Sequence, residues 1–90
     1  VYEAVSDSAE EAEWQASWAR NMQVNLQAAA DLSRFAIAHF RAHGGGRIVN
    51  VASRAGYRGD SPQHWHYAAS KAAMIAVTKT IARGYAAENI

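Results

Sequence analysis

The sequence predicts an α/β fold, a helix–strand–helix segment of a larger parallel sheet. Apolar residues recur at three- and four-residue steps from about residue 10 to His43, which is typical of a helix with one buried face. The β-branched run Arg47–Ala52 follows three glycines and predicts a strand, and a second helix is expected over about Tyr67–Ala87. This order is typical of a parallel α/β sheet. Because one strand alone leaves backbone donors and acceptors unpaired, we expect the segment to be incomplete on its own.

The first helix has sequence signals at both ends and a polar stretch near its middle. Ser8, followed three residues later by Glu11, fits a capping box, and Gly44–Gly46 predicts the C-terminus. At 1.5 Å per residue, some 35 helical residues would span about 50 Å, which is longer than a small domain is wide. The helix is therefore expected to bend, to divide in two or to project, and Arg20–Asn25 is the expected place for a break. The second helix is apolar nearly all round, which predicts that more than one of its sides is covered.

Composition excludes several classes of function. The 90 residues carry nine basic and eight acidic side chains, with a formal net charge of +1, and no basic block that would attract nucleic acid. No apolar run approaches the roughly 20 residues that span a bilayer, and the N-terminus lacks a signal-peptide pattern. The absence of cysteine fits a reducing compartment, so a cytoplasmic location is expected. His64 and His66 have no third ligand nearby, so no metal site is expected.

Tyr67 and Lys71 lie four residues apart, which places them on one face of the second predicted helix. A lysine ammonium beside a phenol favours the phenolate and lowers the pKa of the tyrosine from about 10. Such a tyrosine can act as a general acid or base near neutral pH. The same spacing is equally consistent with a tyrosine at a helix start that packs on a lysine stem.

Two further polar residues are candidates for a site. Ser53 follows the predicted strand, and ligands of open parallel sheets bind at the carboxyl ends of the strands. Its hydroxyl could bind a substrate oxygen, or it could simply bond its own turn. Asn25 lies at the polar interruption of the first helix, where an asparagine can stabilise a bend or be an ordinary half-exposed residue.

Three segments carry these residues in a fixed order. Val24–Leu26 reads VNL, Gly46–Gly56 reads GRIVNVASRAG, and Tyr67–Ala73 reads YAASKAA. Together they resemble the short-chain dehydrogenase/reductase family, in order, context and spacing, and the resemblance extends from about residue 10 to residue 90. It implies a doubly wound, Rossmann-like parallel sheet, of which residues 1–90 would form part of the NAD(P)-binding domain.

The resemblance also implies a role for each of four residues in hydride transfer between a nicotinamide cofactor and a carbonyl or secondary alcohol. Tyr67 would be the general acid or base. Lys71 would lower the pKa of Tyr67 and bind the nicotinamide ribose. Ser53 would orient and polarise the substrate oxygen. Asn25 would hold the helix bend and a water molecule that links Lys71 to solvent.

The sequence departs from the family pattern in what it lacks. The glycine-rich nucleotide loop is absent, so NAD and NADP cannot be distinguished, and the later substrate lobe is absent too. Gly44–Gly46 follows a predicted helix and precedes a predicted strand, the reverse of the nucleotide-loop order. Residues 1–90 alone are expected to be inactive. The implied partners are a small carbonyl or alcohol substrate and further copies of the chain, in a homodimer or homotetramer formed through the long helices.

Two other functions remain open: a non-catalytic truncated member that acts only as an assembly surface, and a related epimerase or dehydratase that uses the same tyrosine and lysine. His64 or Trp65 would contact substrate if their loop borders the pocket; a surface loop is the other interpretation. Trp14 and Trp18, four residues apart on the first helix, are expected to pack rather than to stack on a ligand.

Overall fold

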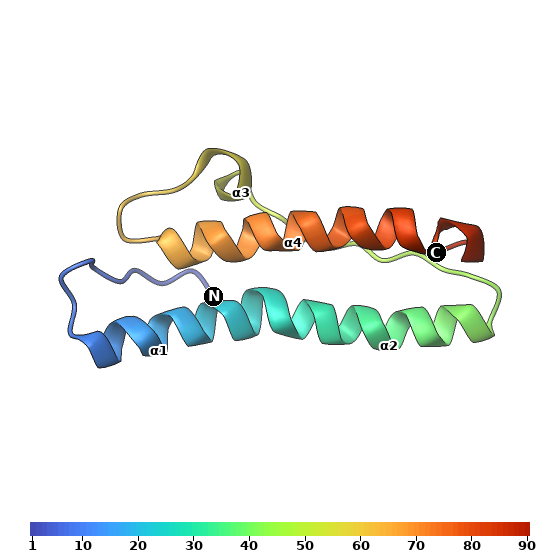
Figure 1. The fold of residues 1–90 in the computed structure, drawn as a ribbon, viewed down its shortest axis with the longest axis horizontal. Helices are drawn as coiled ribbons and strands as arrows, with labels where there is room; N and C mark the ends of the chain where they lie inside the picture. The colour runs from blue at the N-terminus through green and yellow to red at the C-terminus, as the bar shows by residue number, and fades with distance from the viewer.

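The computed structural model describes residues 1–90 as two layers of helix joined by long loops (Figure 1). One layer is a continuous helical rod, and the other is a single helix that runs in the same direction as the rod. The elements, in chain order, are α1 (Glu11–Met22), the π-helical turn η1 (Gln23–Gln27), α2 (Ala28–Ala42), the short α3 (Ala55–Arg58), α4 (Trp65–Gly84) and the 3-10 turn η2 (Ala86–Glu88). No helix is both long and apolar enough to cross a bilayer.

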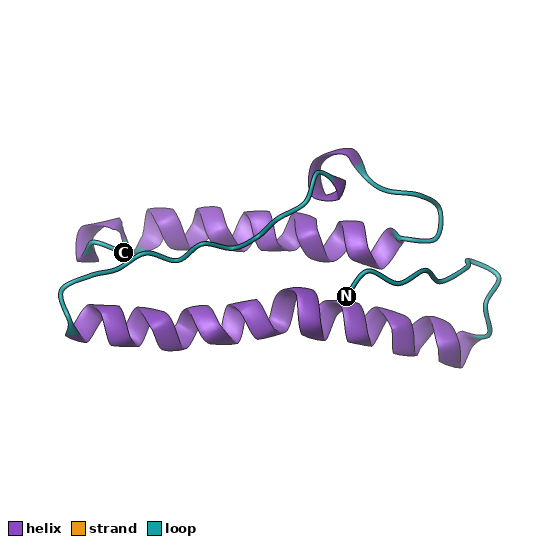
Figure 2. Cartoon of the chain, turned by 180° about the vertical axis from the view of Figure 1, so that it is seen from behind, coloured by secondary structure: helices purple, strands orange, loops and turns teal.

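The predicted strand does not form, so the α/β prediction is wrong for this chain, and residues 1–90 are all helix and loop. Arg47–Ala52 runs along α4 as a loop (Figure 2) and makes no backbone–backbone hydrogen bond. A strand is stabilised by its ladder with a neighbour, and no second segment lies beside this one to supply the ladder. Val49 and Val51 accordingly remain 86% and 77% exposed.

The first helix ends as predicted at its C-terminus but not at its N-terminus. Ser8 does not cap α1: its backbone N–H bonds the Ser6 hydroxyl in a preceding turn, and the cap position is Glu10, which makes no side-chain cap bond. The other end is as predicted, because Gly44 and Gly45 have φ values of +88° and +127° that other residues rarely adopt. The Gly45 N–H then bonds the carbonyl of Phe40 at 2.8 Å.

The polar interruption of the first helix is a π-helical turn rather than a break. η1 overlaps the predicted stretch and has Asn25 at its middle, and the molecule is 50 Å long. Buried positions in the rod recur every fourth residue at Ser17, Asn21 and Asn25. In a regular α-helix such positions rotate by about 40° at each step, so the buried stripe would turn away from its partner. The wider π turn offsets that rotation and keeps the stripe facing α4.

The contact between the two layers is mostly polar. Nine of the 90 residues are buried, and six of these are polar; the buried apolar residues are Val5, Ile37 and Met74. The accessible surface is 6018 Å², against about 5200 Å² expected for a compact protein of this mass. The radius of gyration is 15.4 Å, against about 12 Å for a compact chain of this length. The rod and α4 are therefore held together by few buried side chains, and most of these are polar.

α4 begins two residues before the predicted start and is covered on two sides near that end. α1 and η1 pack on one side and α3 on another. α3 lies close because residue 56 is glycine: a Cβ there would lie 2.9 Å from the Ile75 Cδ1 atom and 3.0 Å from the Ala72 backbone nitrogen. Glycine is therefore required where α3 crosses α4.

We expect Gly56→Ala to lower the free energy of unfolding of the whole protein by about 1–3 kcal/mol, because backbone atoms must move to admit the methyl group. Gly84→Ala is the matched control. A Cβ at Gly84, the last residue of α4, meets nothing within 4 Å, so this change should be neutral or stabilising by up to about 1 kcal/mol. Urea unfolding of both variants tests this; equal stability would contradict the close approach of α3.

Candidate active site

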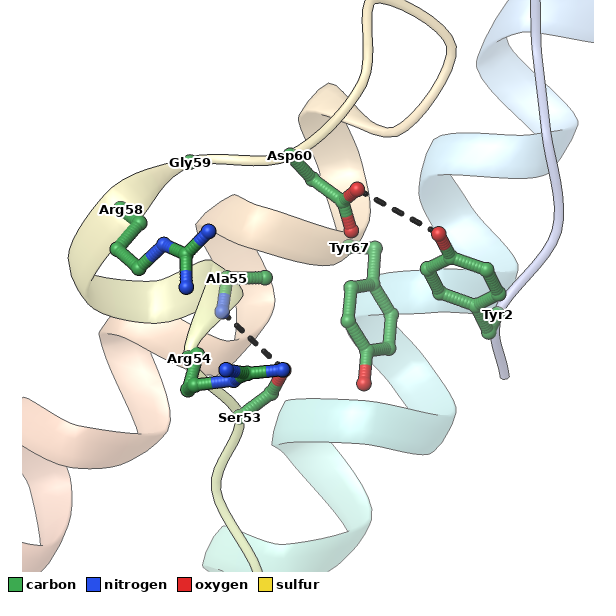
Figure 3. Close-up of a pocket in the computed structure, with 8 residues that line it drawn as sticks. All are labelled: Tyr2, Ser53, Arg54, Ala55, Arg58, Gly59, Asp60 and Tyr67. Carbon is green, nitrogen blue, oxygen red and sulfur yellow. Dashed lines mark hydrogen bonds between the residues drawn. The ribbon is translucent and has the colours of Figure 1, made fainter.

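A pocket of about 410 Å³ opens where α3, the start of α4 and the N-terminal segment meet (Figure 3). This volume is within the range of small-molecule sites. Its lining is polar and comes from three separate parts of the chain: Tyr2, Ser53, Arg54, Ala55, Arg58, Gly59, Asp60 and Tyr67. Two of the four residues predicted for the site, Ser53 and Tyr67, therefore lie in one pocket although fourteen positions separate them.

Ser53 lies at the end of the extended loop, where the chain turns into α3. Its Oγ accepts the backbone N–H of Ala55 at 3.2 Å, so the turn contact considered above is present. That bond uses a lone pair of the hydroxyl and leaves its O–H free to donate. A serine that lines the pocket can therefore serve its turn and donate a hydrogen bond to a bound oxygen.

Tyr67 lies in the first turn of α4, with its ring in the pocket. The edge of this ring meets the ring of Tyr2, with centroids 4.5 Å apart and planes at 85°. The Lys71 Nζ atom lies 5.8 Å from the centre of the Tyr67 ring and donates to the carbonyl of Val51 at 3.1 Å. Lys71 does not line the pocket itself. Its ammonium therefore lies over the Tyr67 ring, and its bond to Val51 ties α4 to the extended loop.

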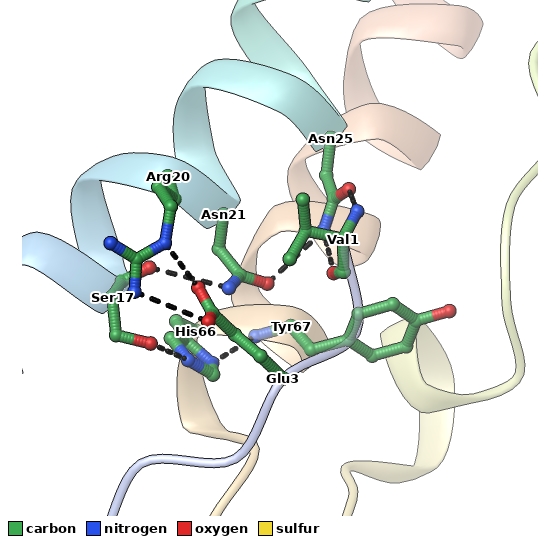
Figure 4. A network of polar contacts seen from close by, with 8 residues as sticks. All are labelled: Val1, Glu3, Ser17, Arg20, Asn21, Asn25, His66 and Tyr67. Atoms are coloured by element: carbon green, nitrogen blue, oxygen red, sulfur yellow. Dashed lines mark hydrogen bonds and ion pairs between the residues drawn. The ribbon is translucent and has the colours of Figure 1, made fainter.

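Asn25 lies outside the pocket, in the buried contact between η1 and α4 (Figure 4). Its Nδ2 atom is 3.2 Å from the Ser70 Oγ, 3.1 Å from the Asn21 Oδ1 and 2.8 Å from the Val1 carbonyl oxygen. Its Oδ1 accepts a bond from the amino group of Val1. Ser70 in turn donates to the carbonyl of Tyr67 at 2.9 Å. Asn25 is thus linked to Tyr67 through one buried hydroxyl and not by direct contact.

His66, the residue before Tyr67, is a buried part of this arrangement that the sequence analysis missed. Its side chain is fully buried, with Nε2 2.8 Å from the Ser17 Oγ and Nδ1 accepting the backbone N–H of Tyr67 at 2.8 Å. Nδ1 therefore carries no proton, and the neutral ring donates from Nε2. The signal for this contact was available, because Ser17, Asn21 and Asn25 have the same four-residue spacing as His66 and Ser70.

Burial lowers the pKa of His66, because the charged ring loses hydration. The charged groups around it act in both directions: the Glu3 carboxylate opposes the shift, while His64 and Arg20 add to it. Glu3 itself pairs with Arg20 at 2.8 Å, and this guanidinium holds the pKa of Glu3 below its ordinary value.

His64 and the three tryptophans pack against other aromatic rings. His64 stacks on Tyr2 with ring centroids 4.1 Å apart, and neither His64 nor Trp65 lines the pocket. Trp14 contacts Trp65 edge to face at 5.3 Å and Trp18 at 5.9 Å. No group of three or more His, Asp or Glu side chains is arranged to hold a metal ion.

A hydroxyl donor and a phenol in one pocket, with an ammonium 5.8 Å from the centre of the phenol ring, form a site suited to proton transfer at a substrate oxygen. The family model described as short chain dehydrogenase matches residues 4–90. The chain therefore belongs to the short-chain dehydrogenase family.

Relatives with curated names agree with this assignment. The chain is 39% identical over 66 residues to an uncharacterised oxidoreductase of Thermotoga maritima, covering 73% of this chain and 26% of that protein. It is 37% identical to a 3-oxoacyl-acyl-carrier-protein reductase of the same organism, covering 81% of this chain and 29% of that protein. It is 36% identical to a cis-4-hydroxycyclohexanecarboxylate dehydrogenase of Sinomonas cyclohexanicum, covering 83% and 30%. The chain thus spans less than a third of the length of these relatives. No solved structure matches it.

We expect the stability of the protein to fall in mild acid because of His66. Its pKa in the folded protein lies below the ordinary value of 6.5, so the unfolded chain binds the proton more readily. The free energy of unfolding is then highest above about pH 6.5 and falls as the pH drops toward the lowered pKa of the folded state. The lowered pKa of Glu3 adds a separate loss at more acidic pH, below its ordinary value of 4.5.

Urea unfolding of the whole protein between about pH 8 and about pH 5 measures this loss. In His66→Phe the loss in the upper part of that range should shrink. His43→Gln is the control, since His43 lies on the surface, where its side chain contacts His39 through a hydrogen bond to the carbonyl and by ring stacking. An identical loss in the wild type and in His66→Phe would contradict the assignment.

Proposed function

We propose that the protein is an NAD(P)-dependent oxidoreductase that interconverts a carbonyl and a secondary alcohol, with Tyr67 as the general acid or base. The observation that supports this most is the joint presence of Ser53 and Tyr67 in one pocket, with Lys71 one helical turn beyond the tyrosine. Family membership and the names of the relatives, which are oxidoreductases, dehydrogenases and reductases, support the same reaction class.

In the reduction direction, Tyr67 donates its phenolic proton to the substrate oxygen as that oxygen gains negative charge. Ser53 donates a hydrogen bond to the same oxygen, and both contacts strengthen as the charge develops. The Lys71 ammonium, 5.8 Å from the ring centre, stabilises the phenolate that remains. In the oxidation direction the phenolate takes the proton back from the alcohol.

The cofactor would bind at Tyr67 and Lys71. Tyr67 and Lys71 offer a hydroxyl and an ammonium on one side of α4, a donor pair suited to the ribose next to the nicotinamide. The cofactor supplies the hydride, and the protein supplies position and a proton. For its phosphates residues 1–90 offer no glycine-rich loop that opens a helix, because Gly44 and Gly45 end α2 and lead into the extended loop.

Asn25 is a positioning residue in this proposal. Its amide holds Ser70, and Ser70 holds the carbonyl of Tyr67. The π-helical turn around Asn25 keeps the amide directed at α4. The link from Lys71 to solvent through water at Asn25 is part of the same proposal.

The second candidate function is assembly without catalysis, and one observation favours a contribution of this kind. Leu32 and Phe35 on α2 are 70% and 75% exposed, which is unusual for large apolar side chains so close together. We propose that this face of the long helix joins copies of the protein in a homodimer or homotetramer. Light scattering of Leu32→Asp should then report a smaller particle than the wild type, and an unchanged mass would exclude this face.

Tyr67→Phe in the whole protein tests the reaction directly. Loss of the phenolic proton should lower kcat by at least about 100-fold. Tyr57→Phe is the matched control: Tyr57 is 73% exposed on α3 and does not line the pocket, so its turnover should equal that of the wild type. Full turnover in Tyr67→Phe would favour the assembly interpretation.

A further inference from the structure

Two arginines line the same pocket as Ser53 and Tyr67. Arg54 directly precedes α3 and Arg58 is its last residue, so the two side chains lie four positions apart on one side of this short helix. Figure 3 shows both arginine side chains among the residues that line the pocket. Two cations therefore border the space where the substrate oxygen would bind.

Neither arginine is neutralised within the protein. The ion pairs of the structure are Arg20 with Glu3 and Arg41 with Glu88, both outside the pocket. The one carboxylate of the pocket, Asp60, is bound elsewhere: its Oδ1 accepts the Ser61 backbone N–H at 2.7 Å and the Tyr2 hydroxyl at 3.4 Å. With two positive side chains and one negative side chain, the pocket lining carries an excess of positive charge.

An unpaired guanidinium in a pocket has a specific chemical preference. Its planar fork of N–H donors matches the two oxygens of a carboxylate or the oxygens of a phosphate. Because Ser53 and Arg54 line the same pocket, an anionic group at Arg54 and a carbonyl oxygen at Ser53 would belong to the same small molecule. A pocket of about 410 Å³ suits a small molecule that carries both groups.

We infer that Arg54, assisted by Arg58, binds a carboxylate of the substrate, so that the substrate is a small oxo acid or the corresponding hydroxy acid. This inference rests on the proposed function, since it takes the carbonyl to lie between Ser53 and Tyr67. Arg54 and Arg58 bind and orient the substrate, and the proton still moves through Tyr67. The carboxylate also replaces the partner that the two arginines lack in the free protein.

Paired probes in the whole protein test this inference. A series of 2-, 3- and 4-oxo acids, each compared with its methyl ester, gives a ratio of kcat/KM for acid over ester. The wild type should favour the acid, and Arg54→Gln should lower that ratio by about 10- to 100-fold, the range expected for loss of a charge-assisted pair. Arg54→Gln with Arg58→Gln should lower it further. Arg83→Gln is the control, because Arg83 is exposed in the last turn of α4 and does not line the pocket.

Two further outcomes separate this inference from its alternatives. An unchanged ratio with a higher KM for NADPH would mean that the arginines bind a cofactor phosphate, and this would overturn the inference. Equal losses for acid and ester would overturn it as well. Binding of the preferred oxo acid to Tyr67→Phe and to Arg54→Gln, measured by calorimetry, does not depend on turnover. Retained binding in Tyr67→Phe with weakened binding in Arg54→Gln supports the carboxylate site, even if Tyr67 proves not to be the acid.

Discussion

The buried polar contact between the helical rod and the start of α4 is the constraint on which the other features of the structure depend. Ser17 meets His66, and Asn25 meets Ser70, in a chain that buries only three apolar residues. Apolar packing tolerates small shifts, whereas a buried hydrogen bond that is broken leaves unpaired groups and costs about 1–3 kcal/mol. Such a contact therefore sets the register of two helices more sharply than the same area of apolar surface would.

This contact links the fold to the proposed chemistry. The side chains of His66 and Ser70 both bond the backbone of Tyr67, one at its N–H and the other at its carbonyl. The first turn of α4 is thereby fixed from the side opposite the pocket, and the phenol projects into the pocket from a rigid base. The arginines and Ser53, in contrast, belong to α3 and its approach, held against α4 by the close passage at Gly56. One wall of the pocket, the first turn of α4, is therefore fixed by buried hydrogen bonds, whereas the other, α3, is held by packing at Gly56. The first arrangement suits the proposed proton transfer, and the second suits the proposed selection of substrate.

The sequence predicted the long helices better than it predicted the fold class. Both long helices follow from apolar periodicity and from Gly44 and Gly45, and the polar stretch around Asn25 indicated the interruption, though not its π-helical form. Arg47–Ala52 does not form a strand, because β propensity belongs to the residues themselves, whereas a hydrogen-bonded ladder needs a second segment beside them.

Ser53 and Tyr67 could be grouped through the family resemblance. The Ser17–His66 contact was missed, because its signal appears only when the four-residue spacing on the first helix is compared with that of His66 and Ser70 on the second. The roles of Asn25, Ser53, Tyr67 and Lys71 stay predictions.

A double-mutant cycle of Asn25→Ala and Ser70→Ala, measured on the free energy of unfolding, tests the central contact most directly. If the amide and the hydroxyl bond each other across the two layers, removal of either side chain should remove most of the free energy of unfolding that the other contributes. The coupling energy should then lie at about 0.5–3 kcal/mol. Losses that add to within about 0.3–0.5 kcal/mol would mean that the two side chains act independently, and would contradict the account of how the rod fixes α4.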